Sequence, residues 1–290
     1  MRILITGANG QLGQALQANP PSWAHITALS SRDFDITDPK RVQETVAASQ
    51  PAWIVNAAAY TAVDKAEEEP EQAKAVNETA VRHLAEAANI NGARLLHVST
   101  DFVFDGTANR PYRPDDDTNP LNVYGRTKLA GERAAMETTH GEAVVVRTAW
   151  VYSRAGKNFL TTMQRLMRER DALNIVDDQR GTPTTASDLA SALWAVVDKN
   201  ANGGIYHFTN KGDASWYEFA VEIRRHLVEQ QPEARLSALE PTDTAGFPTP
   251  AKRPAYSVLN CQRICTIVDI PPHWKTALRR ELDGRAEPDL

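Results

Sequence analysis

Three glycines near the start of the chain place the strongest constraint on its fold. Gly7, Gly10 and Gly13 follow the short apolar run MRILIT and precede a segment with a helical pattern. Such a turn lets a pyrophosphate approach the backbone, and the helix that follows offers unpaired N–H groups to the phosphates. The turn therefore predicts a dinucleotide site, with a purely structural glycine turn as the alternative. The residues expected around the phosphates are Gly7, Asn9, Gly10, Gln11, Leu12 and Gly13.

Strand-like and helix-like segments alternate through the first half of the chain. Continuous apolar strands that alternate with helices are typical of an α/β protein with a parallel sheet covered on both faces. We therefore expect a doubly wound, Rossmann-type sheet. The expected strands are 2–6, 26–29, 53–57, 94–98 and 143–147, and the expected helices are 11–17, 39–49, 71–89 and 124–138.

The pattern changes after about residue 150. Helical segments are expected at 159–170, 187–198 and 216–230, and two proline-rich stretches follow. This predicts a dinucleotide-binding domain over 1–150 and a smaller, mainly substrate-binding C-terminal domain over 151–290. A helix near 183–200 is expected to pack back on the first domain.

Composition excludes several other classes of protein. The net charge of −5 over 290 residues gives no electrostatic support for binding nucleic acid. No run of 18 apolar residues exists, so no membrane span is expected, and the first ten residues do not resemble a signal peptide. Cys261 and Cys265 are interpreted as free thiols, because a CxxxC spacing is not usual for zinc. These features favour a cytoplasmic protein.

The end of the second expected strand bears on cofactor choice. An acidic residue that binds the ribose 2′-hydroxyl of NAD is expected there, but Ser30, Ser31 and Arg32 occupy the place. Serine and arginine can bind a 2′-phosphate, which predicts use of NADPH and leaves NADH open; a solvated Arg32 is the alternative. Asp35 and Ile36 follow and are expected near the adenine, whereas Asp38 precedes a proline and could simply cap the next helix.

A tyrosine and a lysine four residues apart supply a possible proton donor. Tyr124 and Lys128 lie in YGRTK at the start of an expected helix, so both side chains share one helical face. A phenol has an ordinary pKa of about 10, and a neighbouring ammonium lowers the pKa by favouring the phenolate. The spacing alone is equally consistent with a chance pair on the surface.

Thr100 gives this pair its context. It lies in STDFVFDG, at the end of the fourth expected strand, and ligands of open parallel sheets bind beyond the carboxyl ends of strands. Its hydroxyl could therefore meet a substrate oxygen, although Ser99 and Thr100 could also be turn or cap residues. Thr100, Tyr124 and Lys128 are the expected catalytic set.

Longer segments carry a family resemblance. They are NAAAYTAVDKAE at 56–67, STDFVFDG at 99–106, PLNVYGRTKLAGE at 120–132, RTAWVY at 147–152, DDQRGTPT at 177–184 and PTPAKRPAYSVLN at 248–260. Together they resemble the extended short-chain dehydrogenase/reductase superfamily and, within it, the dTDP-4-dehydrorhamnose reductases. The resemblance runs nearly from end to end of the chain.

The resemblance implies roles for individual residues. Tyr124 would protonate the alkoxide, and Lys128 would hold the nicotinamide ribose and acidify Tyr124. Phe102 stands where relatives often carry tyrosine, which removes a hydroxyl. Further cofactor contacts would be Ala57, Ala58, Ala59, Tyr60, Thr61 and Val98. Substrate contacts would be Thr100, Asp101, Phe102 and Trp150 at the sugar, and Asn158, Lys252 and Arg253 at the diphosphate.

The implied reaction is the NAD(P)H-dependent reduction of the C4 ketone of dTDP-4-dehydro-L-rhamnose, the last step of dTDP-L-rhamnose synthesis. The alternatives are another sugar-nucleotide epimerase, dehydratase or reductase on the same scaffold, and a regulatory subunit without turnover. The resemblance leaves a homodimer open, and in some relatives a magnesium site made of glutamates joins the two subunits. Gln14 and Ala15 occupy the place of its expected acid, and no metal is expected.

Overall fold

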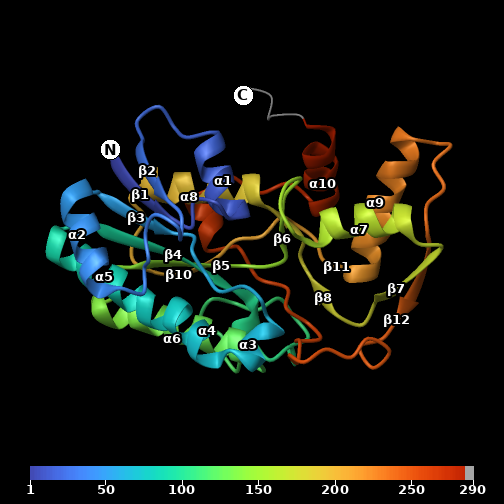
Figure 1. Ribbon diagram of the computed structural model, residues 1–290, viewed down its shortest axis with the longest axis horizontal. Coiled ribbons are helices and arrows are strands. Elements are labelled where there is room, and N and C mark those ends of the chain that lie inside the picture. The colour runs from blue at the N-terminus through green and yellow to red at the C-terminus, as the bar shows by residue number, and fades with distance from the viewer. Residues whose placement is uncertain (285–290) are drawn as a thin grey trace.

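Six parallel strands form the central sheet of the protein (Figure 1). The structure is a computed structural model, which describes residues 1–284. The strand order is β2–β1–β3–β4–β5–β10. The chain runs outward from β1 to β2 and then returns to β3 on the other side, so the order reverses between β1 and β3. Such a switch point opens a crevice at the carboxyl ends of the strands. The strands are β1 (Arg2–Thr6), β2 (His25–Leu29), β3 (Trp53–Asn56), β4 (Arg94–Thr100), β5 (Val144–Thr148) and β10 (Gly204–His207).

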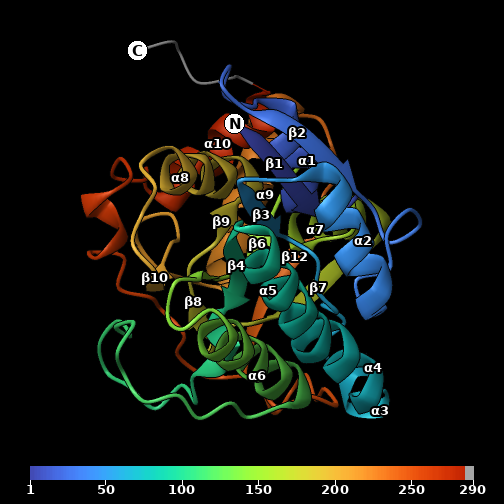
Figure 2. The ribbon, with the colours of Figure 1, turned by 90° about the vertical axis from the view of Figure 1, so that its left-hand side faces the viewer.

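Helices cover both faces of this sheet, as Figures 1 and 2 show. On one face, α1 (Gln11–Ala18) and α8 (Ala186–Asp198) bury leucines against alternate residues of β1, β3, β4 and β5. On the other face, α2 (Pro39–Ser49), α5 (Ala80–Asn91) and α6 (Val123–Thr138) cover the remaining side chains of the strands. Burial on both faces explains why these strands read as continuous apolar runs. The predicted doubly wound α/β sheet is confirmed.

One predicted helix is not regular. The segment expected at 71–89 divides into α4 (Pro70–Lys74), a π-helical turn η1 (Ala75–Thr79) and α5, while a short helix α3 (Lys65–Glu68) precedes it. Single π turns are rare and are frequent at functional sites. The predicted cap of α2 is present, because the Asp38 carboxylate accepts hydrogen bonds from the N–H groups of Lys40 and Arg41.

The second half of the chain forms a smaller unit with its own apolar core, at the right of Figure 1. In this unit β7 (Ala172–Val176) pairs in parallel with β12 (Ala238–Thr242), a pairing the sequence did not predict. Three helices bury apolar side chains against this pair: α7 (Phe159–Glu169), α9 (Trp216–Gln230) and α10 (Trp274–Asp283). Four two-residue strands, β6 (Val151–Tyr152), β8 (Arg180–Gly181), β9 (Thr184–Thr185) and β11 (Ala214–Ser215), complete the connections.

Parts of the second half return to the first sheet. The α8 helix fills one of its faces, and β10, which was not predicted, adds a strand beside β5. Ile264 and Val268 also belong to the core on the α8 side of the sheet. No helix within residues 1–284 is long and apolar enough to cross a membrane.

Candidate active site

The glycine turn that opens the chain has the geometry of a phosphate site. Gly7 has φ of +72°, and a Cβ atom on Gly13 would lie 2.2 Å from the carbonyl oxygen of Gly7. Other residues would strain the first position and clash at the second. Helix α1 begins after Gly10 without a side-chain cap, so its first N–H groups face outward from the turn. This end of α1 can therefore receive an anion.

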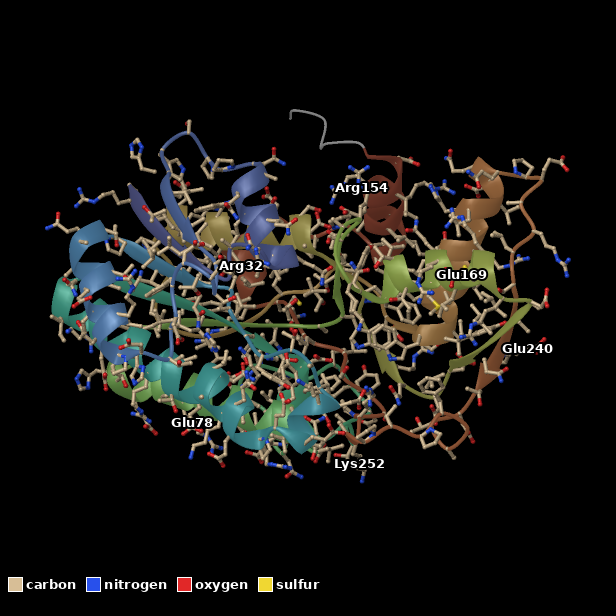
Figure 3. The ribbon with its side chains drawn as sticks, viewed as in Figure 1. Arg32, Glu78, Arg154, Glu169, Glu240 and Lys252 are labelled. Carbon is tan, nitrogen blue, oxygen red and sulfur yellow. The ribbon has the colours of Figure 1, made fainter. Side chains whose placement is uncertain are left out.

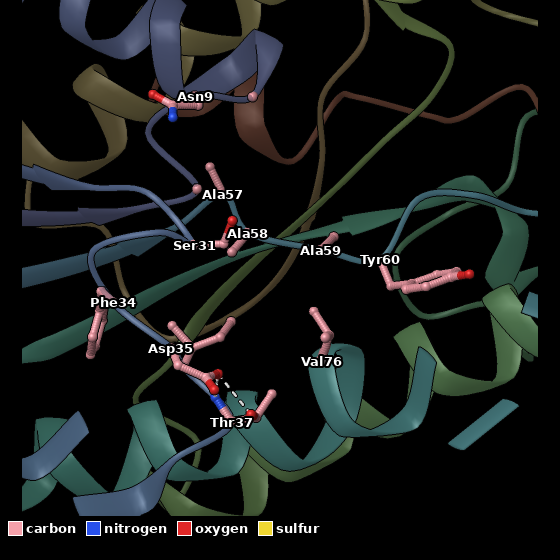
Figure 4. A pocket seen from close by; sticks show the side chains of 13 residues that line it. Asn9, Ser31, Phe34, Asp35, Thr37, Ala57, Ala58, Ala59, Tyr60 and Val76 are labelled. Carbon is pink, nitrogen blue, oxygen red and sulfur yellow. Dashed lines mark hydrogen bonds between the residues drawn. The ribbon is translucent and has the colours of Figure 1, made fainter. Parts of the chain in front are cut away.

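A pocket lies beside this turn, over the carboxyl ends of β1, β2 and β3 (Figure 4). Ten of its thirteen lining residues were predicted at the cofactor: Gly7, Asn9, Gly10, Ser31, Asp35, Ile36, Ala57, Ala58, Ala59 and Tyr60. Phe34, Thr37 and Val76 line it as well and were not predicted. The structure thus brings together turns that follow three separate strands.

Other predicted cofactor residues do not line this pocket. They are Gln11, Leu12, Gly13, Ser30, Arg32, Thr61, Val98, Tyr124 and Lys128. Leu12 is 8 % exposed and packs in the core, and Gln11 turns its side-chain oxygen toward Ser153 and Asn158. Lys128 contacts the main-chain oxygen of Val98.

The turn after β2 contains a carboxylate that the sequence analysis overlooked. The hydroxyl of Ser30 donates to Asp33 Oδ2 at 2.6 Å, and this bond, with the Ser30 N–H and the nearby Arg32 charge, lowers the pKa of Asp33. Arg32 is exposed and lies near the centre of Figure 3, at the end of the sheet that faces the second unit. A cation and an anion therefore share the turn.

The π turn anchors one wall of the pocket. Asn77, which is 1 % exposed, accepts from the Tyr60 N–H at 2.9 Å and donates to the Tyr60 carbonyl oxygen at 3.1 Å. Its amide also donates to the hydroxyl of Thr127 on α6. One side chain therefore fixes the loop after β3 against the helix that carries Tyr124. No local pattern signals this role, because a π turn does not change the apolar periodicity visibly.

The three expected catalytic residues meet at the end of β4. Thr100 is the last residue of β4, Tyr124 lies in the first turn of α6, and Lys128 follows one turn later. Burial raises the pKa of Tyr124 to about 12. A hydrogen bond with the Thr100 hydroxyl lowers this pKa in part, and the nearby Asp101 charge raises it further. The phenol is therefore protonated at neutral pH.

Lys128 does not produce the expected lowering of the Tyr124 pKa. Its Nζ donates to the carbonyl oxygen of Val98 at 2.7 Å and lies 3.3 Å from Nε2 of His97. Burial lowers the pKa of Lys128 to about 8, against the opposing charge of Glu132. The amine is 1 % exposed and is directed into the sheet, which the spacing of two residues on a helix could not show.

Asp101 and Phe102 also lie beside Tyr124 at the end of β4. Asp101 is 2 % exposed, and burial raises its pKa to about 6, partly offset by hydrogen bonds from Ser257 and Thr100. The Thr100 hydroxyl lies 3.0 Å from Asp101 Oδ1. The ring of Phe102 packs edge-on against that of Tyr124, with ring centres 5.7 Å apart. Phe102 thus orients the phenol without a hydrogen bond to it.

The predicted sugar and diphosphate contacts are engaged within the protein. Trp150 has φ of +47° and stacks on Trp216, with ring centres 3.5 Å apart, so one of its faces is covered. The Asn158 amide caps α7 and donates to Gln11 Oε1 at 2.8 Å, which links the second unit to the glycine turn. Both side chains therefore join the two halves of the chain.

The two basic residues between prolines differ from one another. Arg253 forms a two-point ion pair with Asp64 and also donates to Thr249 and to the Ala251 carbonyl. Its guanidinium thus has protein partners, which the sequence analysis did not foresee. Lys252 is exposed, at the lower margin of Figure 3. Within residues 1–284, no group of three or more His, Cys, Asp or Glu side chains is placed to hold a metal ion.

Comparison with known proteins adds independent evidence. The family model described as the RmlD substrate binding domain matches residues 1–286. The chain is 44 % identical over 295 residues to the dTDP-4-dehydrorhamnose reductase of Streptomyces griseus, covering 98 % of this chain and 95 % of that protein.

Two solved structures agree with this match. A dTDP-4-dehydrorhamnose reductase from Clostridium acetobutylicum is 40 % identical, with a TM-score of 0.92, over 98 % of this chain and 99 % of that one. The corresponding enzyme of Bacillus anthracis, in complex with NADP, is 35 % identical with a TM-score of 0.91 and the same coverage. The likeness thus includes both units of the fold.

Proposed function

The chain belongs to the RmlD substrate-binding-domain family, whose relatives at about 40 % identity are dTDP-4-dehydrorhamnose reductases, and on this basis we propose how it carries out that reaction. The protein reduces the C4 ketone of dTDP-4-dehydro-L-rhamnose with NADPH, which completes dTDP-L-rhamnose. The observation that carries this function is the meeting of Thr100, Tyr124 and Lys128 at the end of β4, beside the pocket of the glycine turn.

The residues around the pocket suit a nicotinamide dinucleotide. The glycine turn and the uncapped start of α1 hold the pyrophosphate. Asp35 and Ile36, which line the pocket, would border the adenosine end. Ser31, which also lines it, and the neighbouring exposed Arg32 would bind the 2′-phosphate that distinguishes NADPH. The alanines of the loop after β3 lie alongside the nicotinamide half. When bound, the cofactor supplies the hydride.

Tyr124 supplies the proton. With a pKa raised to about 12, the phenol carries its proton at neutral pH and can give it to the carbonyl oxygen as hydride reaches the C4 carbon. The ketone thereby gains one hydride and one proton and becomes the alcohol, and the phenolate is reprotonated from solvent. The Thr100 hydroxyl has one proton, which it donates to Asp101 Oδ1 in this structure and would turn toward the substrate oxygen that gathers charge. Lys128 holds the nicotinamide ribose.

Residues of both units bind the substrate in this proposal. Asp101, Phe102 and Trp150 border the sugar, and Lys252 and Arg253 face the diphosphate. Because Asp64 already pairs with Arg253, the charge available to the substrate comes mainly from Lys252, with Arg253 fixing the loop. Asn158 holds the second unit against the glycine turn rather than contacting the diphosphate directly.

A direct experiment separates this function from its alternatives. Purified protein is incubated with NADPH and dTDP-4-dehydro-L-rhamnose, cofactor absorbance is followed, and the product is identified by NMR. We expect stoichiometric oxidation of NADPH and formation of dTDP-L-rhamnose. An epimerase or dehydratase would convert a nucleotide sugar without net consumption of NADPH. A regulatory subunit would bind both ligands without turnover.

Two finer expectations stay proposals. A cytoplasmic location is supported by Cys261 and Cys265, which are free thiols in the structure, as is usual in reducing compartments. Immunoblotting of cell fractions tests it. The homodimer rests on the family resemblance alone, and light scattering on the purified protein measures it.

A further inference from the structure

A buried chain of hydrogen bonds leads from the end of β3 to Lys128. The Ala58 N–H donates to Asn56 Oδ1 at 3.2 Å, and the Thr6 hydroxyl donates to the same oxygen at 2.6 Å. Asn56 Nδ2 lies 3.0 Å from Nδ1 of His97, whose Nε2 lies 3.3 Å from Lys128 Nζ. None of these four side chains is more than 1 % exposed.

The Ala58 N–H determines which atoms donate and which accept along these hydrogen bonds. A main-chain N–H can only donate, so the atom of Asn56 that faces Ala58 is the oxygen and the NH₂ group faces His97. Nδ1 of His97 therefore accepts. Burial holds the pKa of His97 well below its usual value, so the ring is neutral, and because Nδ1 accepts, the proton is on Nε2.

An Nε2–H directed at Lys128 favours the neutral form of its amine. Only a neutral amine has a lone pair to accept that proton, and it can still donate to the Val98 carbonyl oxygen. We propose that His97, oriented by Asn56, is a positioning residue that holds Lys128 over Val98 and favours its neutral form in the protein without cofactor. Lys128 then takes up a proton from solvent when the ribose and the Tyr124 phenolate offer acceptors. This inference rests on the role proposed for Lys128.

The surroundings of Lys128 fit this arrangement. Burial lowers its pKa to about 8 despite Glu132, whose carboxylate is occupied by Arg147 at 2.7 Å and by the Ser99 hydroxyl at 2.5 Å. The positive charge of Arg147 partly offsets the effect of Glu132 on the lysine, and a pKa of about 8 makes the neutral amine the main form only above that pH. His97 from β4 and Glu132 from α6 act on the amine directly. Arg147 from β5 pairs with Glu132, and Tyr124 from α6 and Asp101 from the turn after β4 are the other titratable groups at this end of β4.

The first test measures the tautomer. Long-range proton–nitrogen NMR spectra of the cofactor-free protein report which nitrogen of each of its seven histidines carries the proton. The His97 signals are identified by their loss in His97→Gln. We expect a neutral ring with the proton on Nε2. A proton on Nδ1, or a doubly protonated ring at neutral pH, would overturn the proposal.

The second test reverses the donor and acceptor roles of the two His97 nitrogens. In Asn56→Asp the carboxylate accepts from Nδ1–H of His97, so that Nε2 offers a lone pair to Lys128 and favours the ammonium. We expect the His97 tautomer to switch and the pKa of Lys128 to rise by about one unit or more, measured by titrating the ¹³C-labelled lysine Cε signal. His97→Gln should also raise this pKa, because its amide can turn an oxygen toward Nζ.

A matched control is His207→Gln. His207 is equally buried but contacts the Tyr112 carbonyl and Arg147 instead of Lys128, so the Lys128 pKa should not change. An unchanged Lys128 pKa in His97→Gln would overturn the proposal, even if Asn56→Asp fails to fold. All these readouts use protein without cofactor, so a failure of the proposed reductase reaction would leave them interpretable, and the converse also holds.

Discussion

Arg253 and Asp64 lie 189 residues apart in the chain, yet their side chains form two parallel hydrogen bonds of 3.0 and 2.8 Å. The pair joins the loop after β3 to the proline-rich loop of the second half. In the same proline-rich loop, the Ala251 N–H also donates to the Asp64 carboxylate. Through this contact, the wall of the nucleotide pocket and the proposed substrate loop are held as one structure.

Arg253→Ala should raise the KM for the nucleotide sugar by about ten- to a hundred-fold, because it removes the charge-assisted hydrogen bonds to Asp64 that fix the loop of Lys252, and such a bond is worth roughly 1.5–3 kcal/mol. NADPH affinity, measured by fluorescence titration, should not change. Asp64→Asn distinguishes two causes, because it weakens the pair but keeps the cation. If both variants raise the KM equally, Arg253 acts by fixing the loop. If only Arg253→Ala does so, the guanidinium itself meets the diphosphate. An unchanged KM in both would remove this loop from the substrate site.

Cofactor choice depends on the turn after β2. Arg32→Asp places a second carboxylate beside Asp33, so NADPH binding should weaken much more than NADH binding. The matched control Arg41→Asp makes the same charge change at an exposed position of α2. Dissociation constants for both cofactors provide the measurement. Equal losses for NADPH and NADH would show that Arg32 does not contact the 2′-phosphate.

The buried carboxyl of Asp101 should couple stability to pH. Burial raises its pKa from 3.8 to about 6, so the folded protein retains a proton that the unfolded chain has already released. This contribution is fully present below about pH 4 and is lost as the pH rises through 6. Asp101→Asn should therefore gain stability relative to the unaltered protein between pH 5 and pH 8, on the order of 2 kcal/mol at most. Urea unfolding at both pH values measures it, and a stability difference independent of pH would contradict it.

Removal of the Lys128 amine should impair turnover. Lys128→Met keeps a similar length and apolar stem, so the fold should persist while kcat/KM falls by about 10²–10⁴-fold, the usual range for a group that assists proton transfer. Arg126→Met, two residues earlier on the exposed face of α6, is the control and should retain activity. Steady-state kinetics with NADPH give kcat/KM for both variants and for the unaltered protein. Activity near normal in Lys128→Met would exclude Lys128 from the reaction.

Much of the scaffold could be predicted because its signals are local. The glycine turn, the apolar strands and the Asp38 cap each depend on a few neighbouring residues, and the structure contains all three. The π turn at Asn77 could not be predicted, since one extra residue in a helical turn leaves the apolar pattern almost unchanged. The β10 strand was missed because it is short and follows the change in pattern after residue 150.

Contacts between distant segments were beyond the sequence. The sequence predicts a free cation at Arg253, but in the structure Asp64 pairs with it. The sequence also predicts that Lys128 acts on Tyr124, whereas its Nζ contacts the Val98 carbonyl oxygen and His97. The predicted residues of the nucleotide pocket were easier to find because they follow the ends of consecutive parallel strands. Side-chain direction and charge pairing across the fold require the tertiary structure.

The central claim is that Tyr124 gives the proton, and Tyr124→Phe tests it most directly. The substitution removes one hydroxyl and keeps the edge-on ring contact with Phe102, so folding and NADPH binding should be preserved. The measurement is single-turnover oxidation of NADPH at saturating dTDP-4-dehydro-L-rhamnose, with the dissociation constant of NADPH determined alongside. We predict a rate lower by about 10²–10⁴-fold with an almost unchanged dissociation constant. A rate close to that of the unaltered protein would contradict the account.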